Sequence, residues 1–446
     1  MLSIADFPKY EAFKESGVDW LGGIPSDWNV KPGMVAFTES KRDNRGMKES
    51  RVLSLSYGRI IVKPDEKLVG LVPESFETYQ LVDPGDIIVR CTDLQNDQTS
   101  LRTGLAKDKG IITSAYLNLK VNQGYDARYM HYYLHALDTS KVLYKFGTGL
   151  RQNLGYVDFK RLPVLDIPIE WQVDIAKFLE RKTSQIDEAI AIKDKQIALL
   201  KERKQIIIQK AVTQGLDPTV PMKDSGVDWI GEIPAHWDFA KMKYYIDILP
   251  GYAFKSESYS LNDSDVPLLR GINVSPGYIR WGETVFWPKL KLKGFEQYLL
   301  REGDIVIAMD RPWISGGIRV ALVTQGDLPS LLLQRVARIR GEDGLLTGYA
   351  KLLLSTNLFL YYFGPMLTGI SVPHISPEQI ENFATPIPPV DEQREILRYI
   401  EYESKDIEKA VSIQKKQIKS LKEYKAILIN SAVTGKIKIT PDMVED

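Results

Sequence analysis

The chain has 446 residues, 44% of them hydrophobic, which is enough for two or three domains with cores of their own. It carries 58 basic and 58 acidic side chains, and this zero net charge argues against a protein that simply coats nucleic acid. The single cysteine, Cys91, excludes an intrachain disulfide framework and is typical of a reducing compartment. No basic-then-apolar signal opens the chain, and polar residues interrupt its longest apolar segment, 349–370, so we expect a soluble cytoplasmic protein.

The first element along the chain is a short segment rich in glycine and tryptophan, and it occurs twice. Residues 16–28 read SGVDWLGGIPSDW and residues 225–237 read SGVDWIGEIPAHW, with nine of the thirteen positions identical. An internal repeat of this kind fixes the architecture before any other pattern does. Two copies are too few for a stacked solenoid, so the repeat predicts two similar halves related by a pseudo-two-fold arrangement.

A variable block follows each copy, over residues 29–165 and 238–386. Each block contains short β-branched and aromatic runs separated by turn residues, which is the pattern of strands. A Gly-Asp-Ile turn that leads into a strand occurs once in each block, at Gly85-Asp86-Ile87 and Gly303-Asp304-Ile305. One helix is expected in each block, near 128–137 and 349–360. The sequence therefore predicts an α+β module made twice, with unlike loops that carry the specificity.

A long helix is expected after each block. Residues 171–213 contain no Pro or Gly, and Pro168 and Gly215 bracket them as Pro389 and Gly435 bracket the second helix. Apolar positions step by three and four and recur at an offset of 221 residues, with charged residues between them. We expect the helices to pair as an antiparallel coiled coil, the alternative being that each packs separately on its own domain. The expected helix–helix interface consists of Ile175, Leu179, Ile186, Ile190, Ile197, Leu200, Ile207, Ile396, Ile400, Ile407, Val411, Ile418, Leu421 and Leu428.

The sequence shows no convincing catalytic set. A Gly-x-x-x-x-Gly-Lys-Ser/Thr phosphate loop is absent, and the glycines at 146–149 lack the strand, helix and acidic residue of a cofactor loop. The double proline at 387–390 lacks the polar and aromatic neighbours of the Asn/Asp-Pro-Pro-Tyr/Phe motif found in amino-methylating enzymes of DNA. His131 and His135 have a metal-like spacing, but no third ligand is evident, so a packed pair is the simpler interpretation. We expect no cofactor and no metal.

The repeated segments resemble the specificity subunit of Type I restriction-modification systems. The resemblance rests on the Gly-Trp-Pro element at 16–28, on the Gly-Asp-Ile-Ile-Val turn and strand, and on Ile-Pro-Pro-Val-Asp-Glu-Gln at 387–393, which opens a helix ending in Ala-Val-Thr-Gly. It covers nearly the whole chain. The first copy departs from the pattern, because residues 167–172 read Ile-Pro-Ile-Glu-Trp-Gln where Pro-Pro-x-x-Glu-Gln is usual.

This resemblance implies a non-catalytic subunit with two β-rich target-recognition domains held apart by two long antiparallel helices. Each domain would read one half of a bipartite site in double-stranded DNA, and the helices would set the gap between the halves. Two methyltransferase subunits and the motor-nuclease subunits would be its protein partners. The expected divisions are 1–165 (first recognition domain), 166–215 (central helix), 216–386 (second recognition domain) and 387–446 (C-terminal helix).

No family motif identifies the individual base contacts, so the candidate DNA-binding residues come from side-chain chemistry. Loops that follow the Gly-Asp strands and the glycine-rich segments are dense in side chains able to make paired hydrogen bonds with bases. The candidates are Arg59, Arg90, Thr92, Gln95, Asn96, Gln98, Arg102, Arg151, Gln152, Asn153, Arg270, Asp310, Arg311, Trp313 and His374. For each of them, ordinary loop polarity is the alternative.

Two other classes of protein remain possible interpretations. A methyltransferase or nuclease acting alone would need the catalytic motifs that the sequence lacks. A bivalent scaffold that binds proteins and not DNA would use the tryptophans and the coiled coil equally well. Association with a methyltransferase partner separates these alternatives.

Overall fold

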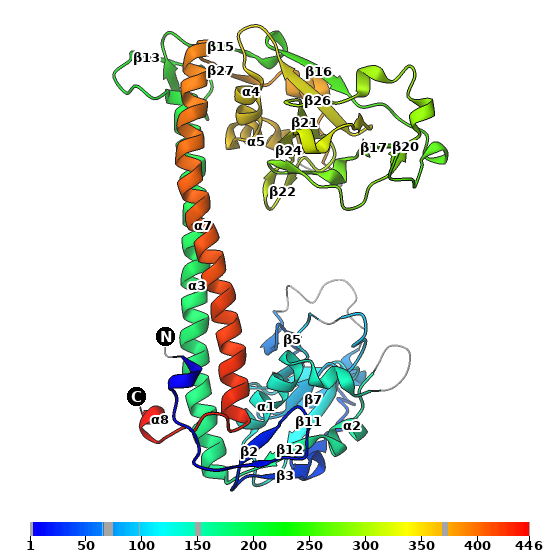
Figure 1. Cartoon of the computed structure of the whole chain (residues 1–446), viewed down its shortest axis with the longest axis vertical. Coiled ribbons are helices and arrows are strands. Elements are labelled where there is room, and N and C mark those ends of the chain that lie inside the picture. The colour runs from blue at the N-terminus through cyan, green and yellow to red at the C-terminus, as the bar shows by residue number, and fades with distance from the viewer. Residues whose placement is uncertain are drawn as a thin grey trace. The chain divides into compact units, whose positions relative to one another are not determined.

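A computed structural model describes residues 3–64, 66, 75–97, 99–147, 153–367 and 373–445 (Figure 1). The chain divides into two compact units: unit 1 comprises Met1–Asp194 and Lys415–Asp446, and unit 2 comprises Lys195–Gln414. Each long helix therefore contributes one part to each unit. None of the helices in the described ranges is long and apolar enough to cross a membrane.

The two long helices are α3 (Ile169–Gln214) and α7 (Val390–Val433). Each begins directly after a proline-containing segment, since proline tolerates the first turn of a helix but not its interior. Each ends just before a glycine with positive φ: Gly215 at 74° and Gly435 at 71°. Glycine adopts this conformation without the steric cost of a Cβ atom, so it ends the helix. The expected helix limits agree with these bounds.

In each unit a part of α3 packs antiparallel against a part of α7. In unit 1 the Asp187 carboxylate lies 2.7 and 2.8 Å from Lys425 Nζ, and Lys193 Nζ donates to Gln417 Oε1 at 2.6 Å. In unit 2, Lys204 Nζ lies 2.6 Å from Glu408 Oε1. In unit 1 the buried Ile186, Leu421 and Leu428 belong to one core cluster with contributions from both helices, as in a coiled coil.

The residues expected at the helix–helix interface differ in burial. Most are buried: Ile175, Leu179, Ile186, Ile197, Ile396, Ile400, Ile407, Ile418, Leu421 and Leu428. Four are half-buried: Ile190, Leu200, Ile207 and Val411. Near the end of α3 the deeper position is Ile208, which packs in the core of unit 2 beside Ile396.

Each unit contains a four-stranded sheet with the same strand order. In unit 1 the order is β4 (Phe37–Glu39), β11 (Leu117–Val121), β8 (Ile87–Val89) and β9 (Thr103–Leu105). In unit 2 it is β16 (Ile246–Pro250), β26 (Val336–Gly341), β21 (Ile305–Ala308) and β24 (Val320–Leu322). All neighbours in both sheets are antiparallel. The predicted α+β class and the internal repeat are confirmed.

Each unit also contains short strands and helices outside its four-stranded sheet (Figure 1). Unit 1 also contains β1 (Phe13–Glu15), β2 (Gly23–Pro25), β3 (Asn29–Pro32), β5 (Leu53–Ser56), β6 (Arg59–Val62), β7 (Gln80–Val82), β10 (Gly110–Ile112), β12 (Pro163–Asp166), α1 (Ala127–Thr139), α2 (Tyr156–Arg161) and α8 (Asp442–Glu445). Unit 2 also contains β13 (Met222–Asp224), β14 (Glu232–Pro234), β15 (Asp238–Lys241), β17 (Val266–Leu269), β18 (Val274–Ser275), β19 (Tyr278–Ile279), β20 (Phe286–Trp287), β22 (Trp313–Ile314), β23 (Gly317–Ile318), β25 (Leu331–Leu332), β27 (Ala384–Ile387), α4 (Thr347–Leu354), α5 (Asn357–Phe363) and α6 (Pro377–Glu381).

The single helix expected near 349–360 is two helices, α4 and α5. The break falls at Ser355 and Thr356, whose hydroxyl groups donate to the carbonyls of Lys351 and Leu353 at 2.7 and 2.6 Å. These hydroxyls satisfy carbonyls that the next helical turn would otherwise occupy. The apolar pattern of the sequence continues across this break, so the sequence alone predicts one helix.

The repeated Gly-Asp turn has the same construction in both units. Gly85 and Gly303 have φ values of 92° and 85°. The buried Asp86 carboxylate accepts the N–H of Asp83 at 2.9 Å, and Asp304 accepts the N–H of Arg301 at 2.8 Å. An arginine neutralises each carboxylate: Arg42 for Asp86 at 2.8 Å and Arg340 for Asp304 at 2.9 Å. A buried carboxylate needs this pairing, and the turn is thereby fixed at the start of the central strand.

The repeated Gly-Trp-Pro element packs at the end of a long helix in each unit. Trp28 and Trp237 are fully buried. In unit 1 the element packs beside the end of α7, where Lys436 Nζ donates to the Leu21 carbonyl at 2.9 Å. In unit 2 it follows the end of α3 directly along the chain, and the Trp237 ring lies near Gly215.

Candidate nucleic-acid interface

In each unit the loop that leaves the central strand returns as the edge strand of the same sheet. Recognition loop 1 (residues 90–102, with Gln98 outside the described residues) joins β8 to β9. Recognition loop 2 (residues 309–319) joins β21 to β24 and contains the short β22–β23 hairpin. Most of the candidate DNA-binding residues belong to these two loops or to the segments that contact them.

The described part of recognition loop 1 is organised around the buried side chain of Arg102, which is 0% exposed. Its Nε donates to the Tyr144 hydroxyl at 3.0 Å. Its two Nη atoms donate to four backbone carbonyls of the loop: those of Arg90 (3.3 Å), Thr92 (2.8 Å), Asp93 (3.2 Å) and Asp97. A guanidinium has five N–H donors, and all five are used inside the protein.

Because the carbonyls of recognition loop 1 point toward the buried Arg102, its polar side chains face outward. Thr92, Gln95 and Asn96 are exposed, whereas the intervening Leu94 is fully buried and anchors the loop. Asn96 Nδ2 donates to Asp93 Oδ1 at 2.8 Å, and Arg90 Nη1 lies 3.2 Å from Asp97 Oδ2. These groups have the donors and acceptors needed to hydrogen-bond base edges.

Recognition loop 2 is organised by Arg319 in the same position, immediately before its edge strand. Nη1 of Arg319 donates to the carbonyls of Asp310 and Arg311 at 3.3 and 3.4 Å, and Nε donates to Val274 at 2.9 Å. Nη2 donates to the Gly271 carbonyl. Burial, together with nearby Arg280 and Arg311, lowers the pKa of the Arg319 guanidinium from its usual value.

Several backbone features coincide in the two loops. The Cys91 carbonyl accepts the N–H of Leu154 and the Met309 carbonyl accepts the N–H of Ile375, both at 2.9 Å. Two residues further on, Asp93 and Arg311 both have positive φ, 60° and 46°. The loops therefore share one backbone frame although their side chains differ.

The exposed groups of recognition loop 2 are more basic and aromatic than those of loop 1. Asp310 Oδ1 accepts from His374 Nδ1 at 2.7 Å and lies 3.7 Å from Arg335 Nη1. Arg311 is exposed, and Trp313 at the start of β22 is 41% exposed. Arg270 precedes the segment whose carbonyls accept from Arg319. Arginine and a partly exposed tryptophan suit contacts with phosphates and base faces.

Some candidate residues have other roles or lie outside the described residues. The expectation that Arg102 contacts DNA is wrong, because the side chain is buried and has no free N–H donor. Arg59 is 71% exposed at its side chain but its Nη2 lies 2.7 Å from Asp187 of α3. Asn153 uses Oδ1 to accept the N–H of Asp93 at 3.0 Å. Gln98, Arg151 and Gln152 lie outside the described residues.

Sequence reasoning missed the role of Arg319 in recognition loop 2. A signal was present, because Arg319 and Arg102 each directly precede an edge strand. The two loops differ in length, so an arginine in one loop does not align simply with an arginine in the other.

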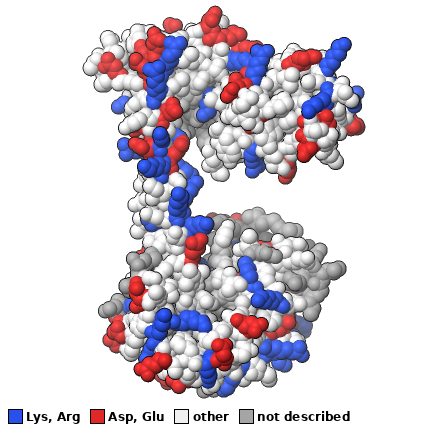
Figure 2. All heavy atoms as spheres, viewed as in Figure 1, with Lys and Arg blue, Asp and Glu red and all other residues white. Residues whose placement is uncertain are grey.

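Basic and acidic side chains are interspersed on the visible face of each unit (Figure 2). This agrees with the zero net charge of the chain. On this face, the candidates for contacting a polyanion are therefore local groups in the recognition loops.

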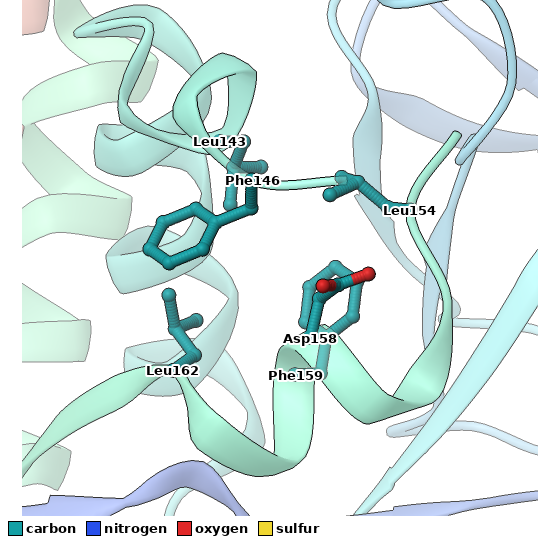
Figure 3. Close-up of a pocket in the computed structure, with 6 residues that line it drawn as sticks. All are labelled: Leu143, Phe146, Leu154, Asp158, Phe159 and Leu162. Atoms are coloured by element: carbon teal, nitrogen blue, oxygen red, sulfur yellow. The ribbon is translucent and has the colours of Figure 1, made fainter. Parts of the chain in front are cut away.

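Two pockets in the described structure differ greatly in size. The pocket of Figure 3, lined by Leu143, Phe146, Leu154, Asp158, Phe159 and Leu162, holds about 10 Å³. That volume suits a single water molecule. A larger one of about 350 Å³ lies in unit 2 beside His236, Glu392 and Glu395. His131 and His135 pack on α1, and no group of three or more metal-ligating side chains gathers within the described ranges.

Comparison with known proteins identifies relatives over nearly the full length. No family model matches the chain. It is 29% identical to the Type I restriction enzyme MjaVIII specificity subunit of Methanocaldococcus jannaschii, over 98% of this chain and 99% of that protein. It is 24% identical to the putative MjaX specificity subunit of the same organism, over 98% of this chain and all of that protein (100%).

A solved structure has the same fold. It is described as the structural basis underlying complex assembly and conformational transition of the type I R-M system, and its matching chain has a TM-score of 0.65 at 16% identity. The match covers 92% of this chain and 98% of that chain. Because the full-length relatives are specificity subunits, the prediction of a non-catalytic subunit is confirmed. Over nearly its full length the chain is similar to specificity subunits of Type I restriction-modification systems.

Proposed function

We propose that this subunit recognises a bipartite site in double-stranded DNA, with recognition loop 1 reading one half and recognition loop 2 reading the other. The observation that supports this most strongly is the shared backbone frame of the two loops with unlike exposed side chains. A conserved frame would hold each loop in the same way toward its half-site, and different side chains would select different bases. A single non-specific DNA surface has no need of two such loops.

Docking of two methyltransferase subunits is the second part of the proposal. Apolar residues that do not face the coiled-coil seam remain exposed on the long helices: Ile192 (60%) and Ile427 (52%) in unit 1, and Ile206 (59%) and Ile413 (46%) in unit 2. An offset of 221 residues relates Ile192 to Ile413 and Ile206 to Ile427. Each unit thus offers an equivalent pair of apolar side chains, which suits two copies of one partner.

In this proposal the chain supplies binding and positioning, whereas the chemistry belongs to its partners. The methyltransferase subunits would modify adenines within the site, and motor-nuclease subunits would join the same assembly for cleavage. Coupling two recognition domains makes the second half-site bind at a high effective concentration once the first is bound. Selectivity therefore requires both halves.

Adenine methylation mapped across the host genome, with and without this gene, tests the proposal directly. We expect one bipartite motif to lose N6-methyladenine when the gene is deleted. If no motif depends on the gene while the chain still binds other proteins, the bivalent scaffold is the better interpretation.

The assignment of half-sites is tested by R90A and R311A in the complex with the methyltransferase. Each substitution should weaken or relax only its own half-site, by about 1–3 kcal/mol for each lost base contact. Binding to oligonucleotides altered in one half at a time measures this. Uniform weakening on all sequences would instead identify the residue as a phosphate contact.

A further inference from the structure

Arg102 and Arg319 stand out because the guanidinium group of each donates to backbone carbonyls of its recognition loop, from a buried position for Arg102 and a half-buried one for Arg319. Arg102 directly precedes β9, and Arg319 directly precedes β24, which is the edge strand in the same place of the second sheet. The N–H of Arg90 donates to the Arg102 carbonyl at 2.8 Å, and the N–H of Ala308 donates to the Arg319 carbonyl at 2.9 Å. The two arginines therefore close their loops at equivalent points.

We infer that Arg102 and Arg319 are equivalent positioning residues, each of which holds the backbone of its own recognition loop in the one shape that presents its exposed side chains to DNA. This inference rests on the proposed function and extends it. It assigns the shape of each loop to one guanidinium, and it separates this role from DNA contact.

The hydrogen-bonding requirements of the loop explain why an arginine is needed. In the described part of recognition loop 1, the carbonyls of Arg90, Thr92, Asp93 and Asp97 have Arg102 as a common donor. Buried carbonyls must find donors, and no ladder partner is available where a loop turns away from the sheet. A planar guanidinium supplies several donors in fixed directions, whereas the ammonium of lysine is a compact charge on a flexible stem.

The surroundings of each arginine hold its plane in place. The Tyr144 hydroxyl accepts from Arg102 Nε, and the centroid of the Tyr144 ring lies 5.2 Å from the guanidinium carbon. The backbone N–H of Arg102 donates to Asp138 Oδ2 at 2.6 Å. Arg319 ties recognition loop 2 to a second segment through the carbonyls of Gly271 and Val274. Neither arrangement depends on which bases the loop contacts.

The test uses R102A and R319A in the full chain assembled with its methyltransferase subunit. DNA carrying a changed first or second half-site measures selectivity for each half separately. We expect R102A to lower discrimination at its own half-site roughly 10-fold or more, the range that losing a base-pair preference spans, and to leave the other half-site unchanged. R319A should have the reciprocal effect. Arg161→Ala and Arg301→Ala remove exposed arginines outside the loops and serve as matched controls.

The lysine variants and the salt dependence separate positioning from DNA contact. R102K should not restore selectivity, because a lysine cannot satisfy the carbonyls together. The slope of log affinity against log salt should stay as in the unsubstituted protein, whereas loss of a phosphate contact would reduce it by about 0.9. Rescue by R102K together with a reduced slope would overturn the inference for Arg102.

A milder variant keeps the test decisive if R102A does not fold. Y144F removes only the hydroxyl that accepts from Arg102 Nε and should lower selectivity in the same half-site by a smaller factor. Unchanged selectivity in a folded R102A, or in Y144F where R102A does not fold, would overturn the inference. If the unsubstituted complex shows no bipartite preference, the proposed function itself fails, which is a distinguishable result.

Discussion

At the scale of single residues, the two halves differ most clearly around their buried tryptophans. Trp237 Nε1 donates to Glu392 Oε2 at 2.8 Å, at the start of α7. The equivalent position in α3 is Trp171, and Trp28 Nε1 is buried with no hydrogen-bond partner among the described residues. The next residue keeps its role in both halves, since Gln172 and Gln393 each accept one backbone N–H and donate to two carbonyls. The departure of the first copy from the family pattern therefore leaves an unsatisfied donor.

We expect W171E to stabilise unit 1 by about 1 kcal/mol, because the carboxylate would accept from Trp28 Nε1 and would also lie favourably at a helix N-terminus. Urea unfolding measures the free energy change. W171L removes the ring without adding an acceptor, so it is the control. A W171E protein no more stable than W171L would contradict the expectation. In unit 2, E392L should destabilise by about 1–3 kcal/mol for the converse reason.

The histidines of α1 predict a pH dependence of stability. The pKa of His131 is lowered to about 3, mainly by burial and to a lesser extent by the neighbouring His135. The pKa of His135 is lowered to about 4, mainly by burial and to a lesser extent by the charge of Lys425. Both values lie below the ordinary 6.5, so the unfolded chain binds more protons than the folded one between pH 6.5 and about 4. Stability contributed by the neutral rings is therefore present above pH 6.5 and is lost as the pH falls.

Together the two histidines should reduce the free energy of unfolding by about 2–4 kcal/mol between pH 6.5 and pH 5. Unfolding of the full chain by urea at both pH values measures this loss. The double substitution H131F/H135F keeps two rings but cannot be protonated, so its loss should be smaller by that amount. An identical pH dependence in the two proteins would show that other groups cause it.

At the scale of elements, α7 carries two neighbouring residues with opposite environments. Leu428 is 0% exposed in the core of unit 1, whereas Ile427 is 52% exposed. L428A should lower the free energy of unfolding by about 2–5 kcal/mol, because it leaves a cavity in the core. I427A should change stability by less than about 0.5 kcal/mol.

Ile427 also provides a test of the proposed docking surface for the methyltransferase subunit. Affinity for the methyltransferase subunit should fall in I427A, and the substitution should leave the unfolding midpoint unchanged. Titration of each variant with the purified partner measures the affinity. If I427A binds as tightly as the unsubstituted chain, the exposed apolar pairs on the long helices are not the docking surface.

The long helices were predictable from sequence, and the recognition loops were predictable only in part. Heptad spacing and the Pro and Gly residues that bracket each helix are local signals, so the bounds of α3 and α7 follow from them. The Gly-Asp turns also follow from local chemistry. Arg102 was misassigned because an arginine in a polar loop has the same local pattern whether it faces solvent or the loop's own carbonyls. The fold decides between these two cases, because the groups that bind Arg102, Tyr144 and Asp138, lie on segments distant in sequence.

At the scale of the whole molecule, the proposed gap between half-sites depends on the length of α3 and α7. The helices contain 46 and 44 residues, and at 1.5 Å per residue they reach about 65–70 Å. A helix of fixed length can act as a spacer because its rise per residue does not vary with sequence. The gap is then a property of helix length and not of the loops.

Inserting one helical turn in both helices, after Ile190 and after Ser420, should change the gap in the methylated motif by one or two base pairs. Both sites lie between the Asp187–Lys425 and Lys193–Gln417 contacts, so the paired insertion keeps the helices matched. One turn adds about 5.4 Å, against about 3.4 Å per base pair. Methylation mapping reads the gap. An insertion of equal length between Pro218 and Thr219, beyond the end of α3, is the control, and an unchanged motif in the helix variant would refute the spacer.

The way Arg102 binds its loop has a consequence for how the specificity of such a subunit can evolve. The guanidinium contacts carbonyl oxygens, which every amino acid possesses, so mutation of the intervening outward residues leaves those bonds intact. New side chains can accumulate at Thr92, Gln95 and Asn96 at little cost in folding free energy. Lineages can thereby acquire a new DNA target while inheriting the same scaffold.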